Sequence, residues 1–222
     1  PVPGAQETKL FYLRSHHDAE RLKTALHTAQ SIAIIGAGYI GLEVAATAAA
    51  LGREVTVIES AARVLARAAS AEVADWLAQR HRAAGVQFHL EARVQSVAPA
   101  QADGFGTALR LSDGCVLTAD LALVGVGALP NDALAQQAGL SVEDGVLVNG
   151  QLQTDDPHIF AIGDCARHPC LWTGERRRIE SIQNAQDQAR HVASVIVGAA
   201  PAPYAAAPWF WSEQGADKLQ MV

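Results

Sequence analysis

The sequence predicts an α/β fold built on a parallel sheet, and three consecutive patterns within residues 31–60 indicate it. Ile32–Ile35 is a short apolar run rich in β-branched residues, which is typical of a buried parallel strand. Tyr39–Leu51 carries apolar residues at helical intervals and stops before Gly52, a residue type suited to the left-handed turn after a helix. Val55–Ile58 is a second apolar strand. Together these patterns predict a strand-turn-helix-strand unit.

Three glycines lie between the first strand and the helix, and Gly36, Gly38 and Gly41 have G-x-G-x-x-G spacing. In this context the spacing is typical of a Rossmann-like dinucleotide site. The first glycine permits a tight turn, the second lets the backbone approach a pyrophosphate, and the third lets helix and strand pack closely. The start of the helix offers unpaired N–H groups to the phosphates. A purely structural glycine turn is the alternative, which the complete unit argues against.

Glu59 ends the second strand, where the motif places an acidic residue. Its carboxylate can accept hydrogen bonds from an adenosine ribose, and its charge would repel a 2′-phosphate. The sequence therefore predicts binding of NAD(H) in preference to NADP(H).

The composition of the 222-residue chain is that of an ordinary globular protein. A formal net charge of −6 argues against general binding to nucleic acid or to an anionic membrane. Glu43, Gly52 and Arg53 interrupt the most apolar region, so no apolar run is long enough to span a bilayer. We expect neither nucleic acid nor a membrane as a partner. The three cysteines are too few for a disulfide framework, so we expect a reducing compartment, the cytoplasm.

Further elements are expected on both sides of the nucleotide unit. His16–Thr28 is predicted to be a short amphipathic helix. Ser70 is a plausible N-cap of a second helix that ends at Gly85. The face that this helix should bury comprises Val73, Trp76, Leu77 and Ala84.

Between Val86 and Thr118 the apolar period changes to two, with turn signals at Asp103-Gly104 and Asp113-Gly114, which predicts an inserted β-meander. Leu121–Val126 is a continuous apolar run, and it should return to the parallel sheet. The glycines at its end lie where ligands bind in open α/β sheets, although a simple exit turn explains them equally well.

The second half of the chain has its own pattern. Asp132–Ala138 should form a short helix, and Thr154–Ala166 should form a short strand followed by Gly163-Asp164. A longer helix follows near residue 182, and Ala199–Pro208 is a Pro/Ala linker. The expected apolar face of the long helix comprises Ile182, Ala185, Ala189, Val192 and Ile196.

Six stretches together resemble the pyridine nucleotide-disulfide oxidoreductase superfamily, and more narrowly the NADH-dependent ferredoxin reductases of the putidaredoxin reductase and rubredoxin reductase type. They are YLRSHHDAERL, GAGYIGLEVAA, VGVGALPN, TDDPHIFAIGDCA, ESIQNAQDQAR and PWFWSEQ, and they occur in the order of that family. The resemblance implies an α/β NADH-binding domain with an inserted meander, the returning part of an FAD-binding domain and the start of an α+β interface domain. Because residues 1–4 contain no initiator Met or signal pattern, and because the family's N-terminal FAD segment has no match, we expect a fragment.

The implied domain boundaries follow the chain. Residues 1–16 would cross from the FAD domain, 17–150 would bind NADH, 151–198 would complete the FAD domain, and 199–222 would be the linker and the start of the interface domain.

The resemblance also implies two sets of cofactor-binding residues. Those for NADH are Gly36, Ala37, Gly38, Tyr39, Ile40, Gly41, Glu43, Glu59 and Gly127. Those for FAD are Arg14, Gly163, Asp164, Ile182 and Trp209. From the residues alone, Asp164 could equally be a helix N-cap, and Trp209 could serve packing in the linker. No side chain is expected to act as a general base.

The implied function is NADH-dependent reduction of FAD, followed by transfer of single electrons to an iron-sulfur ferredoxin or a rubredoxin. One alternative is an isolated, non-catalytic NADH-binding module. Another is a disulfide reductase, because Cys165 and Cys170 have the spacing of a redox pair. In the superfamily, however, that pair belongs to the N-terminal FAD helix, so two reduced thiols are favoured.

Two other clusters could carry function. His158, Cys165, His168 and Cys170 lack metal-ligand spacing, so no metal site is expected. Arg176, Arg177 and Arg178 could attract an acidic electron carrier, although a solvated loop is the favoured interpretation. Arg63 and Arg67 could reach adenosine phosphates, but they are expected to be surface charges.

Overall fold

The computed structural model describes residues 2–6, 8–101, 105–199 and 202–222. They form two compact units. The first extends to Gly127 and includes Glu213–Lys218, and the second comprises Ala128–Ser212 with Leu219–Val222.

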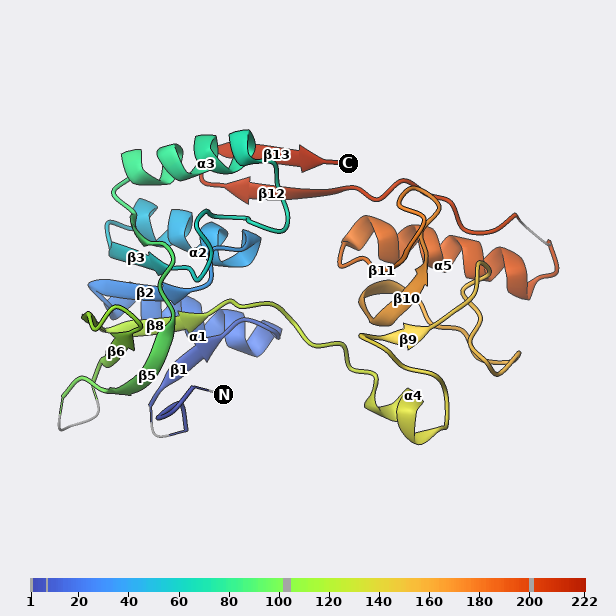
Figure 1. Ribbon diagram of the computed structural model, residues 1–222, viewed down its shortest axis with the longest axis horizontal. Coiled ribbons are helices and arrows are strands. Elements are labelled where there is room, and N and C mark those ends of the chain that lie inside the picture. The colour runs from blue at the N-terminus through green and yellow to red at the C-terminus, as the bar shows by residue number, and fades with distance from the viewer. Residues whose placement is uncertain (1, 7, 102–104, 200–201) are drawn as a thin grey trace. The chain divides into compact units, whose positions relative to one another are not determined.

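The first unit is organised around a five-stranded sheet, whose strands range from blue to yellow-green in Figure 1. All four strand pairs are parallel, which confirms the predicted parallel sheet. The spatial order is β1 (Leu10–Tyr12), β8 (Leu121–Val124), β2 (Ser31–Ile35), β3 (Glu54–Ile58) and β4 (Gln87–His89). The helices that connect these strands are α1 (His16–Thr28), α2 (Tyr39–Ala50) and α3 (Ala71–Ala83).

The predicted helix starts in this unit are confirmed by their caps. Ser15 and Asp18 form a reciprocal capping box at the start of α1, and the Ser70 hydroxyl accepts the N–H of Val73 at the start of α3. The predicted face of α3 is wrong in part, because Trp76 is 45% exposed. The buried residues of α3 are Ala74, Leu77, Ala78 and His81.

A β-meander packs against the parallel sheet. It comprises β5 (Val94–Pro99), β6 (Thr107–Leu111) and β7 (Val116–Ala119), which pair antiparallel in chain order. The core that they share with the parallel sheet contains Ala33, Ile58, Ala92, Val97, Leu109, Leu111 and Ala119. The prediction that the meander starts at Val86 is wrong, because β4 pairs in parallel with β3. An edge strand of a parallel sheet and a meander strand can show the same apolar alternation. The turn predicted at Asp103-Gly104 lies outside the described residues.

The second unit is built around a smaller sheet. β10 (Ala166–Pro169) pairs in parallel with β9 (Val146–Leu147) and antiparallel with β11 (Arg176–Arg178). The short α4 (Ala133–Gln137) and the long α5 (Ile182–Ile196) confirm the two predicted helices. The strand predicted within Thr154–Ala166 is wrong: apart from a single bridge between Gln153 and Phe160, regular pairing starts only with β10.

The last part of the chain is a two-stranded hairpin of β12 (Phe210–Gln214) and β13 (Asp217–Met221). Its tip groups with the first unit and lies along α3, where the Arg80 guanidinium binds the Asp217 carboxylate at 2.8 Å. Residues 200–201 of the predicted linker lie outside the described part of the chain.

Candidate functional site

The three glycines of the first unit meet different surroundings. A Cβ on Gly36 would lie 2.4 Å from the carbonyl oxygen of Gly125, and one on Gly41 would lie 2.2 Å from that of Gly36. Both distances are too short for a real Cβ atom. Only glycine therefore allows the ends of β2 and β8 and the start of α2 to lie this close together. A Cβ on Gly38 would meet no described atom within 4 Å beyond its chain neighbours. The middle glycine therefore faces open space, where a pyrophosphate fits and a side chain would obstruct it.

The first turn of α2 is suited to an anion. Gly38 is the N-cap residue, and no side chain caps the helix there. The initial N–H groups of a helix have no intrahelical partner and carry the positive end of its dipole. Tyr39, Ile40 and Gly41 lie in this turn, so the structure brings the predicted phosphate-binding residues together.

Glu59 contacts the glycine loop directly. Its carboxylate accepts the backbone N–H groups of Ala37 and Ala61, each at 2.8 Å, and the hydroxyl of Ser60 at 3.1 Å. Burial opposes ionisation of this carboxyl, but the hydrogen bonds outweigh burial and hold its pKa below the usual value. A charged carboxylate is thus held at the end of β3, beside the loop that would bind the pyrophosphate.

Residues 60–70 form an irregular loop that is tied to the same site. The N–H of Leu65 donates to the carbonyl oxygen of Ala37 at 3.0 Å, and the hydroxyl of Tyr39 donates to that of Ala68 at 2.9 Å. The Arg63 guanidinium donates to the carbonyl oxygen of Ala66 at 2.9 Å and makes longer contacts with other carbonyls of the loop. Arg63 is therefore a structural residue rather than the predicted surface charge, and only the tertiary structure reveals this role.

Gly127 follows the carboxyl end of β8, and Glu43 lies on α2. The chain leaves β8 through Gly125, whose N–H donates to the carbonyl oxygen of Ile35 at 2.8 Å, and Gly127 has a φ of +108°. The Glu43 carboxylate, on α2, accepts the N–H of Glu213 from the C-terminal hairpin at 3.3 Å. This contact, which the sequence did not predict, connects the hairpin tip to α2.

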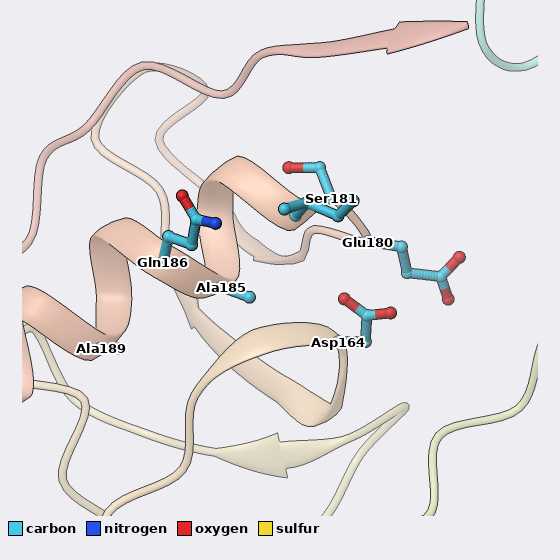
Figure 2. Close-up of a pocket in the computed structure, with 7 residues that line it drawn as sticks. Asp164, Glu180, Ser181, Ala185, Gln186 and Ala189 are labelled. Atoms are coloured by element: carbon cyan, nitrogen blue, oxygen red, sulfur yellow. The ribbon is translucent and has the colours of Figure 1, made fainter.

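A second candidate site lies in the second unit, at the start of α5. An open hollow of about 480 Å³ is lined by Asp164 and by residues 180–182, with apolar Ala185 and Ala189 along the helix (Figure 2). Ser181 caps α5, and the N-cap of the short turn η1 (Gly163–Cys165) is Ile162. Asp164 is therefore the N-cap of neither, and the capping alternative is wrong. The hollow brings Asp164 and Ile182 together, and Gly163 precedes Asp164 in η1.

Comparison with known proteins identifies the family. The family model described as pyridine nucleotide-disulphide oxidoreductase matches residues 1–189. The chain belongs to that family. It is 42% identical to rhodocoxin reductase of Rhodococcus erythropolis over 222 residues, which cover all of this chain and 51% of that protein. It is also 42% identical to putidaredoxin reductase CamA of Pseudomonas putida over 211 residues, covering 95% of this chain and 50% of that protein.

A solved structure supports the same assignment. The ferredoxin reductase for the CYP199A2 system from Rhodopseudomonas palustris matches with a TM-score of 0.93 and 46% identity, covering 99% of this chain and 54% of that chain. The resemblance noted from six sequence stretches is thus confirmed. The chain spans about half the length of the curated relatives it matches.

The face of α5 beside Asp164 is apolar and exposed. The predicted buried face of this helix is wrong: only Val192 is buried, whereas Ile182 is 61% exposed and Ile196 is 66% exposed. The face that turns inward carries Asn184 and Gln188 with Val192. An apolar row is consequently left open along the hollow, and apolar surface beside a carboxylate fits the ring and ribityl chain of a flavin.

The two remaining residues predicted for FAD lie in separate parts of the chain. Arg14 follows β1 in the first unit and is exposed, and its backbone N–H donates to the Asp18 carboxylate at 3.3 Å. Trp209 precedes β12, and its ring centroid lies 5.7 Å from that of Trp211. The two rings thus pack together, which agrees with the packing alternative for Trp209.

The family also contains disulfide reductases, but the cysteines here are free thiols. The Cys165 thiol donates to the carbonyl oxygen of Ile162 at 3.4 Å, and Cys170 is buried. Within residues 2–6, 8–101, 105–199 and 202–222, no group of three or more His, Cys, Asp and Glu could hold a metal ion. In the same ranges, no helix combines the length and apolar character needed to cross a membrane.

The basic run is part of the second sheet rather than a solvated loop. Arg178 binds Asp144 at 3.2 Å and also binds Glu180, and Arg177 binds Glu175 at 2.8 Å. Arg176 donates to the carbonyl oxygen of Val148 at 2.7 Å. Because each guanidinium has a partner within the chain, this run is a weak attractor for an acidic protein.

Proposed function

We propose that this chain supplies the NADH-binding part, and the returning part of the FAD-binding region, of an NADH-dependent flavoprotein reductase. The observation that most strongly supports this proposal is the arrangement of residues 36–59. Two glycines are packed against backbone, the third faces open space, and a charged Glu59 borders the loop.

The residues of the first site have separate roles in this proposal. The first turn of α2 binds the pyrophosphate, and Gly38 leaves room for it. Glu59 accepts hydrogen bonds from the adenosine ribose and repels a 2′-phosphate, so NADH is preferred to NADPH. Glu43 and Gly127 position the nicotinamide end at the carboxyl edge of the sheet.

The hollow beside α5 is the proposed FAD region. Asp164 accepts hydrogen bonds from the ribityl chain, the backbone of Ile182 contacts the flavin, and Gly163 shapes the turn that carries Asp164. Arg14 and Trp209 are kept as proposed FAD contacts, as the resemblance implied. FAD, when bound, accepts a hydride and releases single electrons. The protein holds both cofactors in position.

The domain division is part of the proposal: 1–16 as the crossing segment, 17–150 for NADH, 151–198 for FAD, and 199–222 as linker and start of an interface domain. The proposed acceptor is an iron-sulfur ferredoxin or a rubredoxin. In support, one relative, 42% identical, is named rubredoxin-NAD(+) reductase, and a neighbouring structure, 41% identical, is a covalent complex of putidaredoxin reductase and putidaredoxin. We propose the cytoplasm as the compartment.

An absorption spectrum of the purified protein, supplied with FAD, tests the proposal. Flavin bands at near-stoichiometric occupancy that bleach when NADH is added support it, and NADH should act far better than NADPH. A colourless protein that still binds NADH would instead support the isolated nucleotide-binding module.

A further inference from the structure

The Gly163–Asp164 turn is held by a fully buried side chain that no cofactor role explains. Gln188, on α5, has 0% exposed surface. Its Oε1 accepts the backbone N–H of Gly163 at 2.7 Å, and its Nε2 lies 3.1 Å from Nδ1 of His168 on β10. One amide thus joins the turn, the helix and the strand.

The direction of these hydrogen bonds follows from their chemistry. A backbone N–H can only donate, so the atom of Gln188 that faces Gly163 is the carbonyl oxygen. The amide nitrogen then faces His168 and donates to it. His168 must accept through an unprotonated Nδ1, which makes it a neutral imidazole with its proton on Nε2.

The surroundings of His168 agree with a neutral ring. The side chain is 2% exposed, and burial lowers its pKa below the ordinary value. The ring of Tyr204 contacts it edge-on at 5.3 Å. Across the sheet, its strand partner Arg177 is exposed and bound to Glu175.

Other titratable groups lie around Tyr204 rather than against the imidazole. The His191 ring makes an edge contact with the Tyr204 ring, with 5.6 Å between the ring centroids. Burial raises the pKa of Tyr204 to about 12, with smaller contributions from Asp187 and Cys170. Asp187 accepts hydrogen bonds from Gln183 and Arg190. Among the described residues, no carboxylate forms a hydrogen bond or an ion pair with His168.

The backbone of the Gly163–Asp164 turn is closely constrained by its neighbours. Gly163 has a φ of +71°, and a Cβ there would lie 3.4 Å from the Cβ of Ala185, so η1 packs closely on α5. On its other side, the Arg178 guanidinium donates to the carbonyl oxygen of Asp164 at 3.1 Å. Two hydrogen bonds to the backbone of the turn, from Gly163 to Gln188 and from Arg178 to Asp164, therefore fix the direction of the Asp164 side chain.

We propose that Gln188 is a positioning residue for the flavin site: it orients Asp164 by holding the Gly163 N–H, and His168 keeps the amide in the one orientation that can do so. This inference rests on the proposed FAD-binding role of Asp164. Protonation of His168 at Nδ1 would set an N–H against the Gln188 amino group. Turning the amide over would then set that amino group against the Gly163 N–H, so either arrangement loosens the turn.

The test is the dissociation constant of FAD, measured by flavin fluorescence between pH 5 and pH 8. For the unmodified protein we expect affinity to be highest at neutral pH and to fall by about tenfold as His168 is protonated. His168→Asn keeps an acceptor facing Gln188 but cannot titrate, so it should retain the neutral-pH affinity and remove most of the acid loss. His191→Asn is the matched control, because His191 contacts the same tyrosine but not Gln188, and its profile should follow the unmodified protein.

A second variant separates positioning from simple loss of packing. In Gln188→Leu the side chain makes neither hydrogen bond, so protonation of His168 is no longer coupled to the Gly163 turn. Its FAD affinity should be weaker than normal by about tenfold at pH 7.5, with no further loss towards pH 5. A purely structural role would lower the affinity by the same factor at every pH and leave the acid loss of the unmodified protein in place.

Hydrogen exchange at the Gly163 amide gives a readout that needs no flavin. Protection should be high in the unmodified protein and His168→Asn at neutral pH, and reduced in Gln188→Leu, which removes the acceptor of the Gly163 N–H. Identical pH profiles in all variants, or unchanged Gly163 protection, would overturn the inference while leaving the proposed function intact. If the protein binds no FAD at any pH, the proposed function fails, and the inference about flavin fails with it.

Discussion

The carboxylate of Glu59 accepts the backbone N–H of Ala37 at 2.8 Å, which joins the end of β3 to the glycine loop. The acidic residue is thus part of the loop's own hydrogen bonding and does not simply extend towards a ligand. Its substitution should consequently affect both nucleotide choice and local stability.

Glu59→Gln should relax the discrimination against NADPH. The amide oxygen can still accept the Ala37 N–H, so the glycine loop remains held, but the contact with the Ala61 N–H and the negative charge that opposes a 2′-phosphate are lost. We expect the ratio of NADPH to NADH affinity to rise about tenfold, which corresponds to about 1.4 kcal/mol. Titration calorimetry with both nucleotides measures this ratio. Glu54→Gln, at the exposed start of the same strand, is the control, and an unchanged preference in Glu59→Gln would contradict the assignment.

Gly38→Ala and Gly41→Ala should separate binding from folding. Gly38 has a φ of −78° and open space around it, so alanine should leave the melting temperature nearly unchanged while weakening NADH binding. In Gly41→Ala the new Cβ would lie 2.2 Å from a backbone oxygen, so the helix must shift. We expect about 1–3 kcal/mol of lost stability, as for other overpacked sites. Thermal melts and NADH titrations of both variants measure these effects. Equal melting temperatures for Gly38→Ala and Gly41→Ala would contradict the prediction.

Arg63→Gln should release residues 60–70. The guanidinium holds the Ala66 carbonyl at 2.9 Å and spans several others, which a shorter amide cannot do. Since Arg67 is exposed in this loop, trypsin should cleave after it faster in the variant, as intact-mass spectrometry over a time course can measure. An added Arg67→Gln change should abolish that product. Equal cleavage rates with and without the Arg63 side chain would show that the loop is held by other contacts.

The buried His81 should make stability depend on pH. Burial lowers its pKa, and its Nε2 lies 3.0 Å from the Oε1 atom of Gln214. Because the unfolded chain then binds the proton more readily than the folded one, stability should be fully present above the ordinary histidine pKa and should fall as pH decreases below it.

Urea unfolding at pH 7.5 and pH 5 measures this effect. His81→Asn should reduce the acid-induced loss by about 1 kcal/mol, and the remainder is assigned to His168 and the carboxyl groups. His158→Asn, at an exposed position, should leave the loss unchanged. A His81→Asn curve that parallels the unmodified protein at both pH values would refute a neutral buried His81.

The sequence alone was sufficient for the nucleotide unit because its determinants are local. The glycine spacing, the apolar strands and the terminal Glu59 each act within about 30 consecutive residues, and the clashes at Gly36 and Gly41 involve backbone from the same strand-turn-helix region and the end of a neighbouring strand. The starts of α1 and α3 were predictable for the same reason, since a capping side chain bonds within three residues of itself.

Only the tertiary structure decided how equivalent local patterns are used. The alternation at β4 suits a meander as well as a sheet edge, and pairing with β3 selects the edge. The apolar stripe of α5 was expected to face inward, yet Asn184 and Gln188 are buried because each meets a partner from a distant segment. Asn184 binds Tyr204 as well as the nearby Ile179 carbonyl, and Gln188 binds Gly163 and His168. A buried polar side chain is stable when its hydrogen bonds are satisfied, and sequence periodicity carries no record of partners that are brought near only by folding.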